Sequence, residues 1–171
     1  MKRLFVLRTR SQEDAMFLNS QRSEQLAALA GQVSAADEAT PELFSEIVVA
    51  TARRLWTPSE AANAVQLHDL IEAGALTQAA LSLIDLELPL WKLRRIAYDE
   101  GEWHCAMSRQ RELPEWLDQA VEARHASLTL AILSAYIETV GQIEASREPS
   151  RPSVPQASAQ PYEPLYCENF A

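Results

Sequence analysis

The sequence predicts an α+β protein that is mainly helical, with five or six helices packed around one antiparallel β-hairpin. Alanine and leucine are abundant and only 4 of the 171 residues are glycine, which favours helix over a turn-rich β fold. Start and stop signals for helices recur along most of the chain. From residue 91 onward the apolar pattern changes from a helical period to a period of two, which indicates strands.

Composition shifts at both ends of the chain indicate where the folded part lies. Residues 1–11 are basic, and residues 145–171 hold five of the nine prolines and several serines without any periodicity. We therefore expect a single helical domain with a hairpin over residues 12–144, followed by a disordered Pro/Ser-rich tail.

The expected helices are placed by residues that favour a first turn or end a last one. A first helix over residues 12–32 lacks an apolar stripe at 19–25, so we expect it to be frayed or peripheral. The last helix, over about 127–144, is apolar nearly all round and is expected to be central. The signals between them are Thr40-Pro41, a capping box at Thr57-Pro58-Ser59-Glu60, Gly74 and Pro89. Leu113-Pro114 is expected to open a further helix that includes Val121.

The expected hairpin joins strands at about 91–98 and 102–108 through a three-residue loop, Asp99-Glu100-Gly101. A shorter loop is disfavoured because it needs Glu100 at positive φ. The resulting register pairs Tyr98 with Glu102, Ile96 with His104 and Leu93 with Met107. It places Trp91, Leu93, Arg95, Trp103, Cys105 and Met107 on an apolar face, and Lys92, Arg94, Ile96 and Tyr98 on the other face.

The stretch YDEGEWHC at residues 98–105 has the highest density of chemically capable side chains. His104 and Cys105 are neighbours in a strand, so they point to opposite faces and cannot share a metal ion. Cys105 is expected to be inert packing in the apolar face, because a reactive thiol needs an electropositive, partly open setting. The sequence therefore predicts no catalytic residue, no metal site and no cofactor.

Two sets of residues are candidate contacts for a ligand or a partner. The first lies on the expected hairpin and combines cations with an aromatic ring and an imidazole: Lys92, Arg94, Arg95, Tyr98 and His104. The second lies in the tail, where aromatic residues spaced by four suit docking into a groove: Tyr162, Tyr166 and Phe170.

The charge and the hydropathy of the chain exclude several classes of partner. A formal net charge of −9 disfavours general binding to nucleic acid or to an anionic membrane.

The apolar run Leu4 to Leu7 is shorter than the roughly 7–15 residues of a secretory signal. No stretch reaches the roughly 18 apolar residues of a membrane helix. With only two cysteines far apart in the sequence, we expect a cytoplasmic protein.

A block from Leu70 to about Glu138 carries a resemblance. It reads LIEAGALTQAALSLIDLELPLWKLRRIAYDEGEWHCAMSR and continues with LPEWLD and LAILSA. This block resembles small uncharacterised bacterial proteins that share a WxLRRxxYDxGEWHC motif. The resemblance implies a bacterial module and carries over no activity, ligand or catalytic residue.

These observations together favour a non-enzymatic cytoplasmic protein that acts by binding another protein. The first alternative is a small enzyme or a binder of anionic ligands that uses the hairpin at residues 91–108. The second is a nucleic-acid-associated regulator that uses the basic and aromatic residues of the same hairpin.

Overall fold

The computed structural model describes residues 20–52, 58–110, 112 and 120–147 of the chain. These residues form mainly helices, together with a three-stranded antiparallel sheet in the order β1-β2-β3. The mainly helical fold is thus confirmed, and the sheet has one strand more than the predicted hairpin. In chain order the elements are a helix over residues 20–35, α2 (Pro41–Thr51), α3 (Pro58–Glu72), α4 (Leu76–Glu87), β1 (Lys92–Asp99), β2 (Glu102–Ser108), β3 (Val121–His125) and α5 (Leu128–Arg147).

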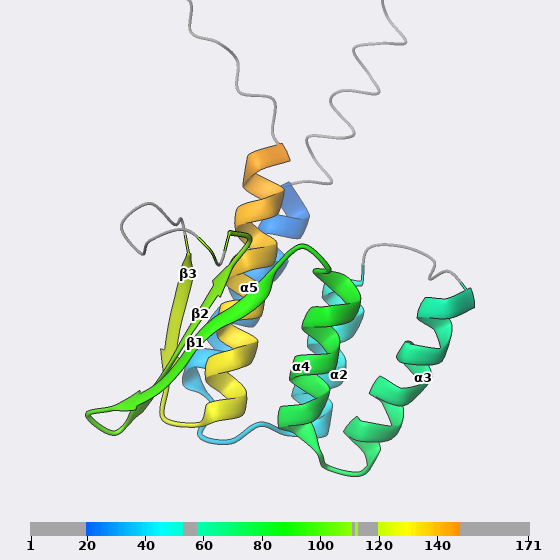
Figure 1. Cartoon of the computed structure of the whole chain (residues 1–171), viewed down its shortest axis with the longest axis horizontal. Coiled ribbons are helices and arrows are strands. Elements are labelled where there is room, and N and C mark those ends of the chain that lie inside the picture. The colour runs from blue at the N-terminus through cyan, green and yellow to red at the C-terminus, as the bar shows by residue number, and fades with distance from the viewer. Residues whose placement is uncertain (1–19, 53–57, 111, 113–119, 148–171) are drawn as a thin grey trace, which may run out of the picture.

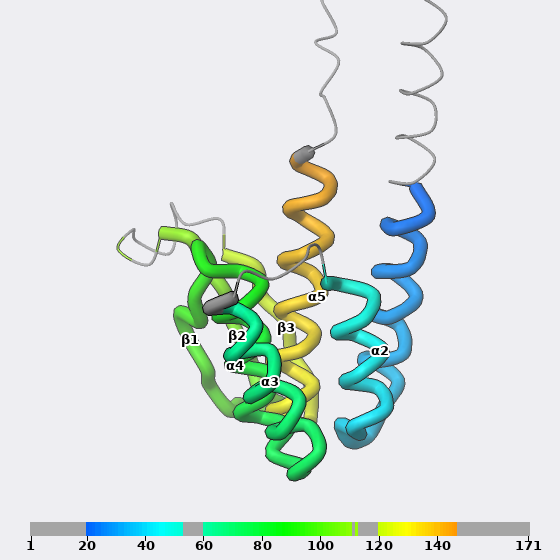
Figure 2. The backbone as a smooth tube through the Cα atoms, turned by 90° about the vertical axis from the view of Figure 1, so that its right-hand side faces the viewer, coloured from blue at the N-terminus to red at the C-terminus, as the bar shows by residue number. Residues whose placement is uncertain are grey.

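The elements are arranged around α5. One side of α5 lies along the sheet, and the helix at residues 20–35 runs along its other side (Figures 1 and 2). Helices α2 and α4 pack beside α5, and α3 lies at the end of the molecule farthest from the sheet (Figure 1). The tip of the β1–β2 hairpin projects away from the helices.

The local helix signals are confirmed where they fall within the described residues. The Thr40 hydroxyl accepts the N–H of Leu43 at 3.2 Å and so caps α2. Gly74 has φ 72° and ends α3 in a Schellman motif, with Gly74 N–H donating to Ile71 C=O and Ala75 N–H donating to Leu70 C=O. The capping box predicted at Thr57 lies outside the described residues.

The prediction that the long apolar helix is central is confirmed. Its buried residues occupy all sides of α5, as in Leu130, Ala131, Ile132 and Leu133. The helix ends at Arg147, beyond the predicted domain boundary at 144. The described part of the first helix is not peripheral as predicted, because a stripe formed by Leu26, Leu29 and Val33 is buried in the same core.

The third strand corrects the prediction of a helix that starts at Leu113 and includes Val121. Residues 113–119 lie outside the described part of the chain, and Val121–His125 form β3. The strand pairs with β2, which places Ala123 opposite Cys105 and Val121 opposite Met107. This pairing extends the apolar face that α5 covers, an interaction between distant segments that local propensity does not encode.

The hairpin also differs from the prediction in the position of the residue that has no cross-strand partner. Asp99 pairs with Glu102, so the loop has two residues, and both take positive φ: 50° for Glu100 and 94° for Gly101. This matches the twist of a type I′ turn. The register shifts once, between Leu93 and Arg95, so Leu93 still pairs with Met107 as predicted. Arg94 is therefore the extra residue, in a bulge, and the predicted three-residue loop is wrong.

The bulge decides which face each β1 side chain takes. Arg95 now pairs with Ala106, and Tyr98 pairs with Trp103 instead of Glu102. Because paired residues share a face and neighbours alternate, Arg95 leaves the apolar face. The guanidinium of Arg95 thereby avoids the large free-energy cost of burial in the core. This gain offsets the backbone strain of the positive φ at Glu100.

This strain leads to a prediction. Replacing Glu100 by Asn, a residue that tolerates the left-handed conformation, is expected to stabilise the protein by about 0.5–1 kcal/mol. Urea unfolding measures the change. The Glu100→Ala variant is the control, because it removes the same charge but keeps the conformational penalty. A gain in Glu100→Ala equal to that in Glu100→Asn would point to charge, not backbone strain.

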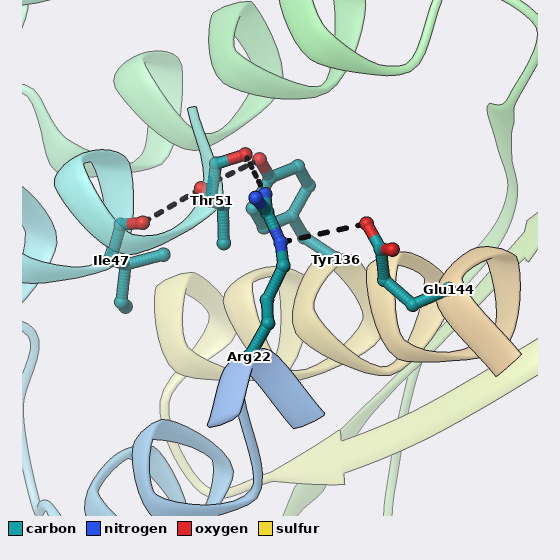
Figure 3. A network of polar contacts seen from close by, with 5 residues as sticks. All are labelled: Arg22, Ile47, Thr51, Tyr136 and Glu144. Atoms are coloured by element: carbon teal, nitrogen blue, oxygen red, sulfur yellow. Dashed lines mark hydrogen bonds and ion pairs between the residues drawn. The ribbon is translucent and has the colours of Figure 1, made fainter. Parts of the chain in front are cut away.

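A polar network that is buried at Thr51 and Tyr136 and partly exposed at Arg22 joins three helices (Figure 3). The Tyr136 hydroxyl donates to Thr51 Oγ1 at 2.9 Å, and that hydroxyl donates to the Ile47 carbonyl at 2.7 Å. Arg22 Nη2 donates to the Thr51 carbonyl at 3.2 Å, and its Nε lies 3.5 Å from a Glu144 carboxylate oxygen. The network ties residues 20–35, α2 and α5 together.

Candidate functional site

The sheet has one covered face and one open face. Trp103, Cys105 and Met107 of β2 lie on the face that α5 packs against, with Cys105 and Met107 buried. The intervening residues His104 and Ala106 lie on the other face. There they are flanked by Ala97 and Arg95 of β1 and by Arg124 and Glu122 of β3.

Charges on the open face are compensated within the sheet. Arg95 Nη2 lies 3.7 Å from Glu122 Oε1, and Arg124 Nε lies 3.9 Å from Glu102 Oε2. These pairs are solvent-exposed, so each contributes only about 0–1 kcal/mol to stability. Their main effect is electrostatic, because carboxylates beside both guanidinium groups weaken the attraction of this face for an anion.

A hollow of about 280 Å³ lies beside His104 and Ala106, and three of the ion-paired residues just described border it: Arg95, Glu122 and Arg124. Cys105 and Ala123 complete its lining. The imidazole of His104 is half-buried in its wall. The predicted outward orientation of His104 is confirmed, although its partner across the strand is Ala97 and not Ile96. His104 thus lies beside ion-paired residues, and Cys105, which also borders the hollow, is only 1% exposed.

Cys105 occupies the opposite side of the same strand. Only 1% of its surface is exposed, and burial raises the pKa of the Cys105 thiol from 9.0 to about 11. A neutral, enclosed thiol is a poor nucleophile. The prediction that Cys105 packs in the apolar face is confirmed.

The hairpin cations do not form the predicted strip with Tyr98. Lys92 pairs with Ser108 on the open face and binds the Asp85 carboxylate of α4, whereas Tyr98 lies on the covered face. Arg94 forms the bulge between Leu93 and Arg95. The predicted sharing of one face by Lys92, Arg94 and Tyr98 is therefore wrong, because the bulge changes the alternation.

The outer edge of β1 is the surface feature that the sequence did not reveal. β2 pairs with one edge of β1, and no strand of the described chain pairs with the other (Figure 1). Ile96 and Tyr98 lie along this edge on the covered side of the sheet, beyond the area that α5 shields, and are 43% and 61% exposed. Tyr98 packs on Trp103 with ring centroids 5.0 Å apart. Ile96 was predicted to share a face with Tyr98, but it was not among the candidate contact residues.

Backbone geometry makes this edge able to accept another strand. In a hairpin with a two-residue loop, the flanking pair Asp99–Glu102 exchanges hydrogen bonds and every second pair does the same. The N–H and C=O groups of Ala97 and Asp99 thus face β2, and those of Ile96 and Tyr98 face outward. The close Tyr98–Trp103 ring contact agrees with a non-hydrogen-bonded pair, in which side chains approach most closely.

A second hollow, of about 360 Å³, lies between the helix at residues 20–35 and α5. Small and apolar side chains such as Ala27, Ala30 and Ile137 form most of its wall. Glu138 borders it, and burial raises the pKa of its carboxyl group. Nothing in the described structure indicates what would fill this groove.

Metal-binding clusters, membrane-spanning helices and the two chain ends complete the survey of candidate features. Within the described ranges, no group of three or more His, Cys, Asp or Glu side chains is placed to hold a metal ion. None of the described helices combines the length and the apolar character needed to cross a membrane. The tail residues Tyr162, Tyr166 and Phe170 and the basic segment 1–11 lie outside the described residues.

Comparison with known proteins adds no family to this picture. No protein-family model, curated protein or solved structure matches the chain. The similarity to small bacterial proteins around residues 91–105 therefore stays a prediction.

Proposed function

We propose that the protein is a non-enzymatic binding protein, and that the outer edge of β1 is the surface by which it binds another protein. The observation that carries the proposal is an edge strand of eight residues with two large apolar side chains exposed on it. Proteins usually protect such edges, because an open edge is a template for pairing with another chain. An edge that displays Ile96 and Tyr98 suits recognition by strand addition.

The contacts within the hairpin support this mode of binding. The cross-strand packing of Tyr98 on Trp103 orders the strand before a partner arrives, which lowers the entropy lost on binding. A partner segment in extended conformation would hydrogen-bond to the outward backbone groups of Ile96 and Tyr98. Its alternate side chains would cover the two exposed apolar residues.

The chemistry of the other candidate surfaces supports a binding role over catalysis. Cys105 is buried with a raised pKa, and His104 lies among ion-paired residues. Two of the hairpin cations that could hold an anion or a nucleic acid already contact carboxylates: Lys92 lies against Asp85, and Arg95 lies near Glu122. We place the protein in the cytoplasm, where a buried free thiol such as Cys105 is under no pressure to pair.

Affinity purification from the native cell tests the proposal. The bait is the full chain as wild type, as the double variant Ile96→Lys/Tyr98→Lys, and as the control Val49→Lys. Val49 is 79% exposed on α2, so the control adds charge to an exposed apolar site away from the sheet. We expect the edge variant to lose the partner and the control to retain it. Equal recovery by all three baits contradicts the proposal.

A further inference from the structure

We infer that the partner strand for the edge of β1 is β1 of a second copy of this chain, paired antiparallel about a two-fold axis at Ala97. The inference rests on the proposed function, since it uses the same edge. Its basis is the order of charges along the strand, KLRRIAYD, which is cationic at its start and anionic at its end. An antiparallel copy brings the two ends of opposite charge together.

Backbone geometry limits the possible registers. Because Ile96 and Tyr98 present their N–H and C=O groups outward, they must pair with outward-facing residues of the second strand. This leaves three central registers: Ile96 opposite itself, Ala97 opposite itself, or Tyr98 opposite itself. Each is symmetric, and only the side chains distinguish them.

The register centred on Ala97 matches the side chains on both faces. It places Ile96 opposite Tyr98 of the second copy, twice by symmetry, so that the exposed apolar residues cover each other. On the open face it places Arg95 opposite Asp99 of the second copy, also twice. Neither of the other registers brings Arg95 and Asp99 together.

The small side chain at the centre favours close approach of the strands. Ala97 and its symmetry mate form a non-hydrogen-bonded pair, in which Cα atoms are about 4.5 Å apart. The Arg95–Asp99 pairs are of the same close type. The guanidinium of Arg95 has several N–H donors, so it can contact Asp99 of the second copy while it remains near Glu122. The two three-stranded sheets would then join into one continuous sheet.

A charge-exchange experiment on the purified full chain tests this arrangement. Arg95→Asp alone and Asp99→Arg alone each place like charges opposite one another, so sedimentation equilibrium should show the dimer dissociation constant raised by about tenfold or more. An equimolar mixture of the two variants makes both cross-strand pairs opposite in charge again. We expect the mixture to recover dimerisation as a heterodimer. Single variants that dimerise like wild type, or a mixture that stays monomeric, would overturn the inference.

A cross-linking arm reads the register without relying on charge reversal. In a Cys167→Ser background, Ala97→Cys should form a disulfide-linked dimer under mild oxidation, since the expected Cα separation is within disulfide range. Ile96→Cys and Tyr98→Cys report the two other registers and should cross-link far less. Preferential cross-linking of either one contradicts the assigned register. If purified wild-type chain stays monomeric while affinity purification recovers a different partner that depends on Ile96 and Tyr98, self-pairing fails but the proposed function stands.

Discussion

Replacing Tyr136 by alanine is expected to destabilise the protein by about 3–5 kcal/mol, a large part of the roughly 5–15 kcal/mol by which a typical domain is stable. The side chain is fully buried in α5 and bonds through its hydroxyl to Thr51 of α2. Truncation leaves a cavity between the two helices and removes the bond that joins them (Figure 3). Denaturant unfolding followed by circular dichroism measures the loss.

Two matched variants separate the causes of this loss. Tyr136→Phe keeps the ring and removes the hydroxyl, so we expect a cost of about 1 kcal/mol. Tyr98→Ala removes the same side chain from an exposed strand position, where about 0.5–1.5 kcal/mol of aromatic pairing with Trp103 is at stake. A Tyr136→Ala variant no less stable than Tyr98→Ala would contradict the buried position of this ring.

Cys105 is expected to react with thiol reagents at least about 100-fold more slowly in the folded protein than in the urea-unfolded chain. Burial raises its thiol pKa from 9.0 to about 11. At pH 8 the reactive thiolate fraction therefore falls from about one in ten to about one in a thousand. Enclosure of the sulfur, with 1% of the residue exposed, slows the reaction further.

Labelling in a Cys167→Ser background measures this rate for Cys105 alone. The rate should rise as urea unfolds the protein, in parallel with the loss of helix signal. Rapid labelling of the folded protein at pH 8 would show an open, ionised thiol and would reopen the enzymatic alternative for the hairpin.

Local signals in the sequence predicted most of the helices. The caps of α2 and α3 depend on residues within one turn of each other, such as Thr40 and Gly74, so their physical causes are present in a short window. The same holds for the apolar α5. These signals account for the mainly helical fold.

The sheet was predicted less well because its geometry depends on distant residues. β3 is specified by pairing with β2 and packing on α5, and the apolar–polar alternation of its VEARH sequence is too short to distinguish a strand from part of a helix. The bulge at Arg94 has no glycine or proline to mark it. The predicted register put the unpaired residue in the loop so that Glu100 would avoid a positive φ, whereas the protein adopts that φ and keeps Arg95 out of the core.

The register shift at Arg94 places the predicted contact residues on different surfaces of the protein. Arg95 and His104 lie on the open face, Tyr98 lies on the covered face, and Lys92 binds α4. Ile96 was not a candidate, although it becomes part of the exposed edge. The sequence signal that could have identified Ile96 is the mixture of charged and apolar residues in the KLRRIAYD strand.

The openness of the β1 edge supports both proposals, and amide hydrogen exchange of the dilute, full-length protein tests it most directly. We expect the amides of Ile96 and Tyr98 to exchange quickly and those of Ala97 and Asp99 slowly, since only the latter two face β2. Strong and equal protection of all four amides at a concentration where the chain is monomeric would show that another part of the same chain covers this edge, and would contradict the account.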